Sequence, residues 1–144
     1  MVYNIESLSN DELLFAYKDV ILYYEKLVKD KKGFYINSKE FQSFIKDKNI
    51  LIKNTTAEEI KIAFNTKKLT ESYFLFTTSN YSQVRDLYRH LRNSFAHGLF
   101  TKTEIKKTVF LCFDDIYNKK YTMRGQIQKE LFVEFIEKLQ QTKK

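Results

Sequence analysis

The residues of this chain that could do chemistry are Arg92, Asn93 and His97, which are followed by Gly98. Arginine is a permanent cation with a forked set of donors that suits phosphate. Histidine can give or take a proton near neutral pH. A fixed cation beside a titratable imidazole is the minimum equipment for cutting RNA without a metal. We therefore take the first three residues as the candidate site.

The segment that must position these residues is predicted to be an amphipathic helix, capped by Asn80 or Ser79 and ending at His97. At about 100° per residue, its side chains fall on three faces. The core stripe consists of Val84, Leu87, Leu91 and Phe95. A polar stripe about opposite consists of Asp86, His90, Asn93 and His97. A strongly basic face between the two consists of Arg85, Arg89 and Arg92.

Arg92 and His97 do not share a face of this helix. An angle of about 140° separates them, so they cannot touch unless the last turn loosens. Gly98 can end the helix there by taking the left-handed conformation. Asn93 lies one turn before His97 and can bridge the pair. This geometry suits a groove shared with a second surface, which argues for a dimer.

Structural interpretations of the same residues stay open. His97 can simply be a cation near the C-terminus of a helix, where it contributes about 0.3–1 kcal/mol. The arginines can be solvated or paired with Asp86. His90 is interpreted as a structural residue or an RNA contact rather than as part of the reacting site.

The chain as a whole predicts one soluble domain that spans residues 1–144. A chain of this length can bury a sizeable core, and its 43% hydrophobic and 30% charged residues are ordinary for a globular protein. The formal net charge of +7 and the pI of about 9.3 favour polyanionic partners without naming one.

Several classes of protein are not expected. Cys112 is the only cysteine, so neither an intramolecular disulfide nor a zinc cluster is available. No cluster of Asp, Glu and His has metal-ligand spacing, and we expect neither a metal nor another cofactor. The first residues lack the features of a signal peptide, and no apolar stretch approaches the length of about 20 residues that spans a bilayer. A cytoplasmic protein without membrane contact is expected.

The remaining patterns predict a mainly α-helical protein. Capping residues and apolar spacing predict helices over 9–31, 38–48, 79–97 and 126–141, and a further helix that opens at Thr56. Two short strands, 108–114 and 119–123, form a small hairpin around Asn118. The stretch 69–78 suits a buried helix turn or a strand, and we favour helix. The three glycines, Gly33, Gly98 and Gly125, are interpreted as boundaries between helices and strands.

The string Arg92-Asn93-x3-His97 at the end of an amphipathic helix resembles the HEPN superfamily. Its signature is Arg-x(4–6)-His, usually with a polar residue directly after the arginine. Here the spacing is four and the polar residue is Asn93, so the match is full. The resemblance implies a HEPN-like up-and-down helical bundle with a small β-hairpin before the C-terminal helix. It also implies a homodimer that brings two copies of the motif into one cleft.

Many HEPN proteins are metal-independent endoribonucleases of toxin–antitoxin, abortive-infection or other defence systems. By this resemblance Arg92 and His97 are catalytic and Asn93 orients them. The neighbouring 2′-hydroxyl would attack the phosphodiester, with His97 as general base or acid and Arg92 stabilising the charge on the phosphorane. The RNA-binding residues would be Arg85, Arg89 and His90.

The expected partners are RNA and a second copy of the chain, and an antitoxin protein is a further candidate partner. Antitoxin-paired members that a nucleotidyltransferase modifies carry a tyrosine two residues after the histidine. This chain has Leu99 there, so that mode of control is not expected. Two other functions stay open: a non-catalytic RNA- or nucleotide-binding HEPN module, and a helical protein-interaction domain.

Overall fold

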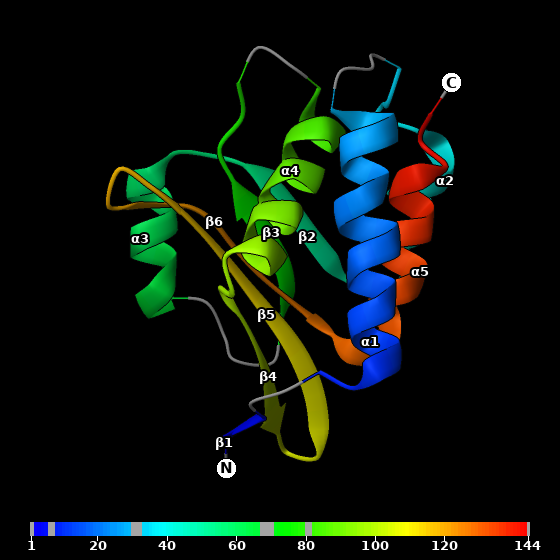
Figure 1. The fold of residues 1–144 in the computed structure, drawn as a ribbon. Helices are drawn as coiled ribbons and strands as arrows, with labels where there is room; N and C mark the ends of the chain where they lie inside the picture. Colours follow the sequence, from blue (N-terminus) through cyan, green and yellow to red (C-terminus); the bar gives the residue numbers. More distant parts are fainter. Residues whose placement is uncertain (1, 6–7, 30–32, 67–70, 80–81, 144) are drawn as a thin grey trace.

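A six-stranded sheet forms the frame of the protein in the computed structural model (Figure 1). The structure describes every residue except 1, 6–7, 30–32, 67–70, 80–81 and 144. The strands are β1 (Val2–Ile5), β2 (Ile50–Asn54), β3 (Ser72–Phe76), β4 (Phe100–Ile105), β5 (Thr108–Tyr117) and β6 (Lys120–Gln128). The helices are α1 (Asn10–Phe15), the π-helical η1 (Ala16–Leu22) and η2 (Tyr24–Val28), α2 (Lys39–Asp47), α3 (Ala57–Thr66), α4 (Gln83–Ala96) and α5 (Lys129–Gln140).

Helices cover both faces of this sheet. Its strand order is β1-β4-β5-β6-β3-β2, and all neighbours are antiparallel except the parallel pair β2 and β3. Strand β3 separates two cores: Phe74 and Phe76 belong to the main one, whereas Tyr73 and Leu75 pack with Ile60 of α3. Side chains of η1, η2, α2, α4 and α5 build the main core on one face, and α3 lies apart from them in the view of Figure 1.

The expectation of a mainly α-helical, up-and-down bundle is therefore wrong, because the fold is α/β. The stretch 69–78, for which helix was favoured, contains strand β3, whose five residues are all buried. An apolar run of this length fits a buried strand as well as a helix turn. Strands β2 and β4 lie outside the predicted elements. Their burial does not alternate cleanly, so their sequences carry no clear period of two.

The hairpin before the last helix is confirmed and is longer than expected. It turns at Asn118 and Lys119, whose φ angles are 50° and 64°, as a two-residue hairpin turn requires. Gly125, interpreted as a boundary between elements, instead lies inside β6 opposite Phe74. A Cβ added there would come within 2.3 Å of the Phe74 ring. Close approach of that ring to the backbone explains this glycine.

The first helical stretch buries a narrower stripe than its sequence predicts. Its capping box is present: the Ser9 hydroxyl accepts the Glu12 backbone N–H, and the Glu12 carboxylate accepts the Ser9 N–H. The buried side chains recur every four residues and are Ala16, Val20, Tyr24 and Val28. The wider π-helical winding of η1 and η2 suits a spacing above 3.6 residues per turn. Exposed instead are Leu13, Tyr17 and Leu27, which the helical spacing also placed in the stripe.

Hydroxyl caps also open α2 and α3. Ser38 accepts the backbone N–H of Phe41 at 3.3 Å, and Thr56 accepts that of Glu59 at 3.3 Å. The chain then closes with α5, which begins three residues later than expected because β6 continues to Gln128. In the described parts of the chain, every helix is too short or too polar to span a bilayer.

Candidate catalytic site on helix α4

Helix α4 carries the predicted site residues, and His97 is the residue that caps its C-terminus. The N-terminal cap is Ser82, whose hydroxyl accepts the N–H of Arg85 at 3.1 Å. Ser79 is therefore not the cap, and Asn80 lies outside the described residues. Gly98 takes the predicted left-handed conformation with φ +68°. The helix packs between strand β5 and the segments η1 and η2.

This packing covers much of the polar stripe of α4. Asp86 is 0% exposed and His90 is 1% exposed, whereas Asn93 is half-buried and His97 is exposed. Buried polar groups need hydrogen-bond partners, and both buried residues have them. Of the two interpretations of His90, the structure favours the structural one.

A chain of hydrogen bonds leads from the sheet to the arginine of the motif. His90 Nε2 lies 2.8 Å from the carbonyl oxygen of Thr77, and its Nδ1 lies 2.7 Å from Oδ2 of Asp115. The same Asp115 oxygen accepts a hydrogen bond from Nδ2 of Asn93 at 3.1 Å. Oδ1 of Asn93 accepts from Nη1 of Arg92 at 3.0 Å. The motif is thus tied to strand β5.

Asp115 lies outside the predicted site, although the alternation of β5 carries a signal for it. Leu111 and Phe113 point into the main core, and Asp115 is the next position on that face. Burial alone raises the pKa of the Asp115 carboxyl, but hydrogen bonds from His90 and Asn93 outweigh it and hold the pKa below its ordinary value. Asp115 is therefore ionised at neutral pH.

Arg85 is held largely inside the protein. Its side chain is 13% exposed, and its Nη1 lies 3.1 Å from Oδ1 of the fully buried Asp86. Its Nε donates to the carbonyl of Lys29 at 3.2 Å. Asp86 also accepts the backbone N–H of Ser79 at 2.8 Å and lies 3.8 Å from Nε of Arg89. Arg89 is more exposed than Arg85, at 32% of its side chain.

Arg92 is fixed from two sides and still reaches the surface. Asn93 holds Nη1, and Oε1 of Glu25 on η2 lies 2.9 Å from Nη2. The side chain is 31% exposed, but its Nε is shielded from solvent and meets no acceptor among the described residues. Burial raises the pKa of the Tyr24 hydroxyl, although the charges of the three arginines act in the opposite direction.

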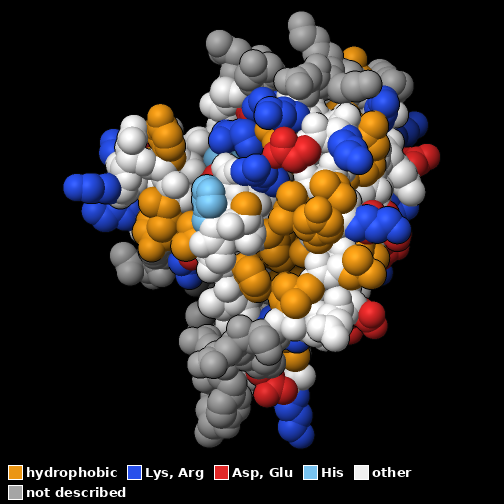
Figure 2. Space-filling model, in the orientation of Figure 1, with side chains coloured by type: hydrophobic (Ala, Val, Ile, Leu, Met, Phe, Trp, Pro, Cys, Tyr) orange, Lys and Arg blue, Asp and Glu red, His pale blue; other side chains and the backbone are white. Residues whose placement is uncertain are grey.

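The imidazole of His97 makes no hydrogen bond or ion pair within the described part of the chain, and its side chain is exposed. Figure 2 shows the face that carries α4: Lys and Arg side chains gather there, with a histidine beside them and an apolar area next to both. Across the described ranges, no group of three His, Cys, Asp or Glu side chains is arranged to hold a metal ion.

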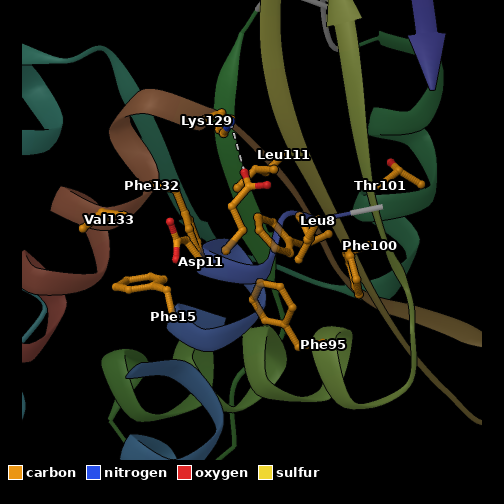
Figure 3. A pocket seen from close by; sticks show the side chains of 12 residues that line it. Leu8, Asp11, Phe15, Phe95, Phe100, Thr101, Leu111, Lys129, Phe132 and Val133 are labelled. Atoms are coloured by element: carbon orange, nitrogen blue, oxygen red, sulfur yellow. Dashed lines mark ion pairs between the residues drawn. The ribbon is translucent and has the colours of Figure 1, made fainter. Parts of the chain in front are cut away.

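An apolar cavity of about 190 Å³ lies beside the C-terminal end of α4 (Figure 3). Five rings line it: Phe15, Phe95, Phe100, Phe113 and Phe132. At its rim Glu12 pairs with Lys102 at 3.0 Å and with Lys129 at 3.2 Å. Burial raises the pKa of the Glu12 carboxyl, but the Ser9 backbone N–H and the two lysines lower it to about 2. Phe95 and Phe100 stand on either side of His97 in the chain, so this aromatic cluster fixes the backbone around the histidine.

One family model matches almost the whole chain. The model described as HEPN pEK499 p136 matches residues 3–143. No curated protein matches the chain, and no solved structure does. The resemblance to the HEPN superfamily, based on Arg92, Asn93 and His97, is thereby confirmed. The chain belongs to the HEPN pEK499 p136 family.

Proposed function

We propose that this protein is a metal-independent endoribonuclease whose catalytic residues are Arg92, Asn93 and His97. The observation that carries the proposal is how Arg92 and His97 are placed on α4. The guanidinium of Arg92 is fixed by Asn93 and Glu25, while the imidazole of His97, at the end of the same helix, is exposed to solvent. Membership of the HEPN pEK499 p136 family supports it.

The residues divide the chemistry between them. His97 takes the proton of a ribose 2′-hydroxyl, whose oxygen then attacks the adjacent phosphorus. The bond from phosphorus to the 5′-oxygen breaks, and the protonated His97 of a second copy of the chain gives its proton to that oxygen as general acid. Arg92 donates to the phosphorane oxygens, where charge builds in the transition state. The products are a 2′,3′-cyclic phosphate end and a 5′-hydroxyl end. Arg89, whose side chain is 32% exposed, can hold a flanking phosphate.

A second copy of the chain is part of the proposal. Among the described contacts, no hydrogen bond or ion pair joins Arg92 to His97 within one chain, so one copy supplies half of a two-histidine site. Large apolar side chains on α1 and η1 support such a contact. Leu13 is 49% exposed, Leu14 is 61% exposed and Tyr17 is 56% exposed. Large apolar side chains that are exposed side by side are typical of a protein–protein interface.

A second candidate function is a non-catalytic RNA- or nucleotide-binding module. The surface-reaching guanidinium of Arg89 favours this module, because a cation on α4 can hold a phosphate without any cleavage. This candidate predicts salt-sensitive RNA binding without cleavage products. For the ribonuclease, a role in defence or as a toxin with a matching antitoxin is the biology we propose. A domain that only docks on an acidic protein predicts neither RNA binding nor toxicity.

The test is RNA degradation in the presence of a chelator. The wild type is compared with His97→Ala and Arg92→Ala, and the ends of the products are identified. General acid–base catalysis contributes about 10²–10⁴-fold, so His97→Ala is expected to lose at least about 100-fold in rate. Lys61→Ala is the matched control, because it removes an exposed cation from α3, away from α4. Equal rates for all four proteins would exclude the catalytic assignment.

A further inference from the structure

The orientation of Arg92 is determined outside the motif. Its guanidinium donates to Oδ1 of Asn93, and that amide in turn donates to Asp115. Asp115 comes from strand β5, and its second partner is His90, one turn before Asn93 on α4. Three polar side chains, those of His90, Asp115 and Asn93, therefore form a hydrogen-bonded series that ends at the guanidinium of Arg92.

We infer that Asp115 and His90 are positioning residues for the proposed reaction: they orient the amide of Asn93, and this amide orients the guanidinium of Arg92. The inference rests on the proposed function, in which Arg92 contacts the phosphate.

The chemistry of the donors and acceptors gives the chain a direction. An amide carries one acceptor and one donor end, and its two orientations differ little in shape. A carboxylate can only accept, so Asp115 takes the NH2 end of Asn93. The oxygen end then faces Arg92, whose guanidinium can only donate. If the Asn93 amide were reversed, its NH2 group would face the guanidinium of Arg92, and two donors would oppose each other. Asp115 therefore determines that the oxygen of Asn93 faces Arg92.

His90 fixes the carboxylate in the same way. An ionised carboxylate only accepts, so Nδ1 of His90 donates to Asp115, while Nε2 lies 2.8 Å from the carbonyl oxygen of Thr77. The side chains of His90 and Asp115 are 1% and 4% exposed. Water does not compete for these bonds, which strengthens them. The ladder between β5 and β6 is also irregular between Asp115 and Ile116, and such bulges re-aim side chains near sites.

The neighbouring residue offers a matched control. Asp114 lies next to Asp115 on the opposite face of β5, where it pairs with Arg124 at 3.8 Å. Asp115→Ala is expected to lower kcat about 10- to 100-fold with KM little changed, as displacement of a reacting group does. Asp114→Ala should leave kcat unchanged. Asp115→Asn should restore much of the rate, because an amide oxygen at the Oδ2 position can accept both hydrogen bonds.

A double mutant separates positioning from general stability. If Asp115 acts through Arg92, Asp115→Ala should cause no further loss of kcat in the Arg92→Ala background. A merely structural role would lower the rate again. Should Asp115→Ala not fold, Asn93→Asp replaces it, because the half-buried carboxylate cannot donate to Asp115 and breaks the same chain. The same absence of further loss is then expected with Arg92→Ala.

A second readout does not need cleavage. In ¹⁵N NMR spectra, the Nε–H signal of Arg92, assigned by its loss in Arg92→Ala, should shift or broaden in Asp115→Ala and stay in place in Asp114→Ala. If the wild type cuts no RNA, the proposed function fails, yet this signal still decides the positioning role. An unchanged Arg92 signal in folded Asp115→Ala, or an equal change in Asp114→Ala, would overturn the inference.

Discussion

His90 and His97 lie about two turns apart on one helix and almost on one line along it, yet their surroundings are opposite. His90 is 1% exposed and has an oxygen partner at each ring nitrogen. His97 is exposed and, among the described residues, its ring has none. The first is a fixed part of the interior, and the second is available to a ligand.

The difference arises from what faces the helix at each level. Strand β5 brings Asp115 against the middle of α4, and the carbonyl of Thr77 closes the other side of His90. At the level of His97 the helix ends and Gly98 turns the chain toward β4. The angle around a helix therefore does not decide whether a polar residue is structural or reactive. The neighbouring strand decides it.

The largest effect that would test this comparison is on stability. His90→Ala leaves Asp115 buried without its main partner, and breaking a buried pair costs about 3–5 kcal/mol. His97→Ala should change the free energy of unfolding by no more than about 0.5 kcal/mol, as surface substitutions do. Urea unfolding of both variants checks this. A similar loss of stability in the two would mean that His97 is also held by the fold.

Acid should separate Asp115 from Asp114 on the two faces of β5. The folded-state pKa of Asp115 is lowered, so its contribution to stability is complete above the unfolded value of about 3.9 and is lost as the pH falls through the folded value. The folded-state pKa of Asp114 is raised by burial, although the charge of Arg124 partly offsets this. Ionised Asp114 therefore lowers the free energy of unfolding at neutral pH, and this loss disappears when the carboxyl is protonated on acidification.

Below about pH 4, the stability of Asp115→Asn should therefore fall less with decreasing pH than that of the wild type. The stability of Asp114→Asn should fall more. Thermal unfolding midpoints measured from pH 7 to pH 3, in the same buffer and salt, check both signs. Equal slopes for the two variants would show that the two faces do not differ.

Two arginines of α4 that differ in exposure extend the comparison to RNA binding. Arg89 is 32% exposed and Arg85 is 13% exposed with Asp86 beside it. Arg89→Ala is expected to weaken single-stranded RNA binding about 3- to 10-fold and to lower the salt slope by about 0.7. Arg85→Ala should leave the slope unchanged and lower stability, since Asp86 loses a partner. Fluorescence anisotropy at several salt concentrations distinguishes the two, and a changed slope for Arg85→Ala would contradict this assignment.

The sequence predicts the parts of this molecule that are local in the chain. Caps at Ser9 and Thr56 and the turn at Asn118 are such features, and all three are present. The pairing of β2 with β3 and of β1 with β4 joins distant segments, and their short strands have no regular period. The same limit applies to the site. Arg92, Asn93, His97 and Gly98 form a local pattern, whereas Glu25 and Asp115 reach it only through tertiary packing.

The smallest expected effect concerns how the end of α4 presents His97. Gly98 has φ +68°, and a Cβ added there would meet nothing within 4 Å, so Gly98→Ala adds only the backbone cost of about 1–2 kcal/mol. The His97 backbone N–H stays bonded to the carbonyl of Asn93 at 2.9 Å, so cleavage should change less than about threefold in rate. Gly125→Ala, whose Cβ would strike Phe74, should destabilise more without approaching the motif. A loss of cleavage in Gly98→Ala far beyond its loss of stability would mean that the turn, and not the last bond of the helix, positions the exposed histidine.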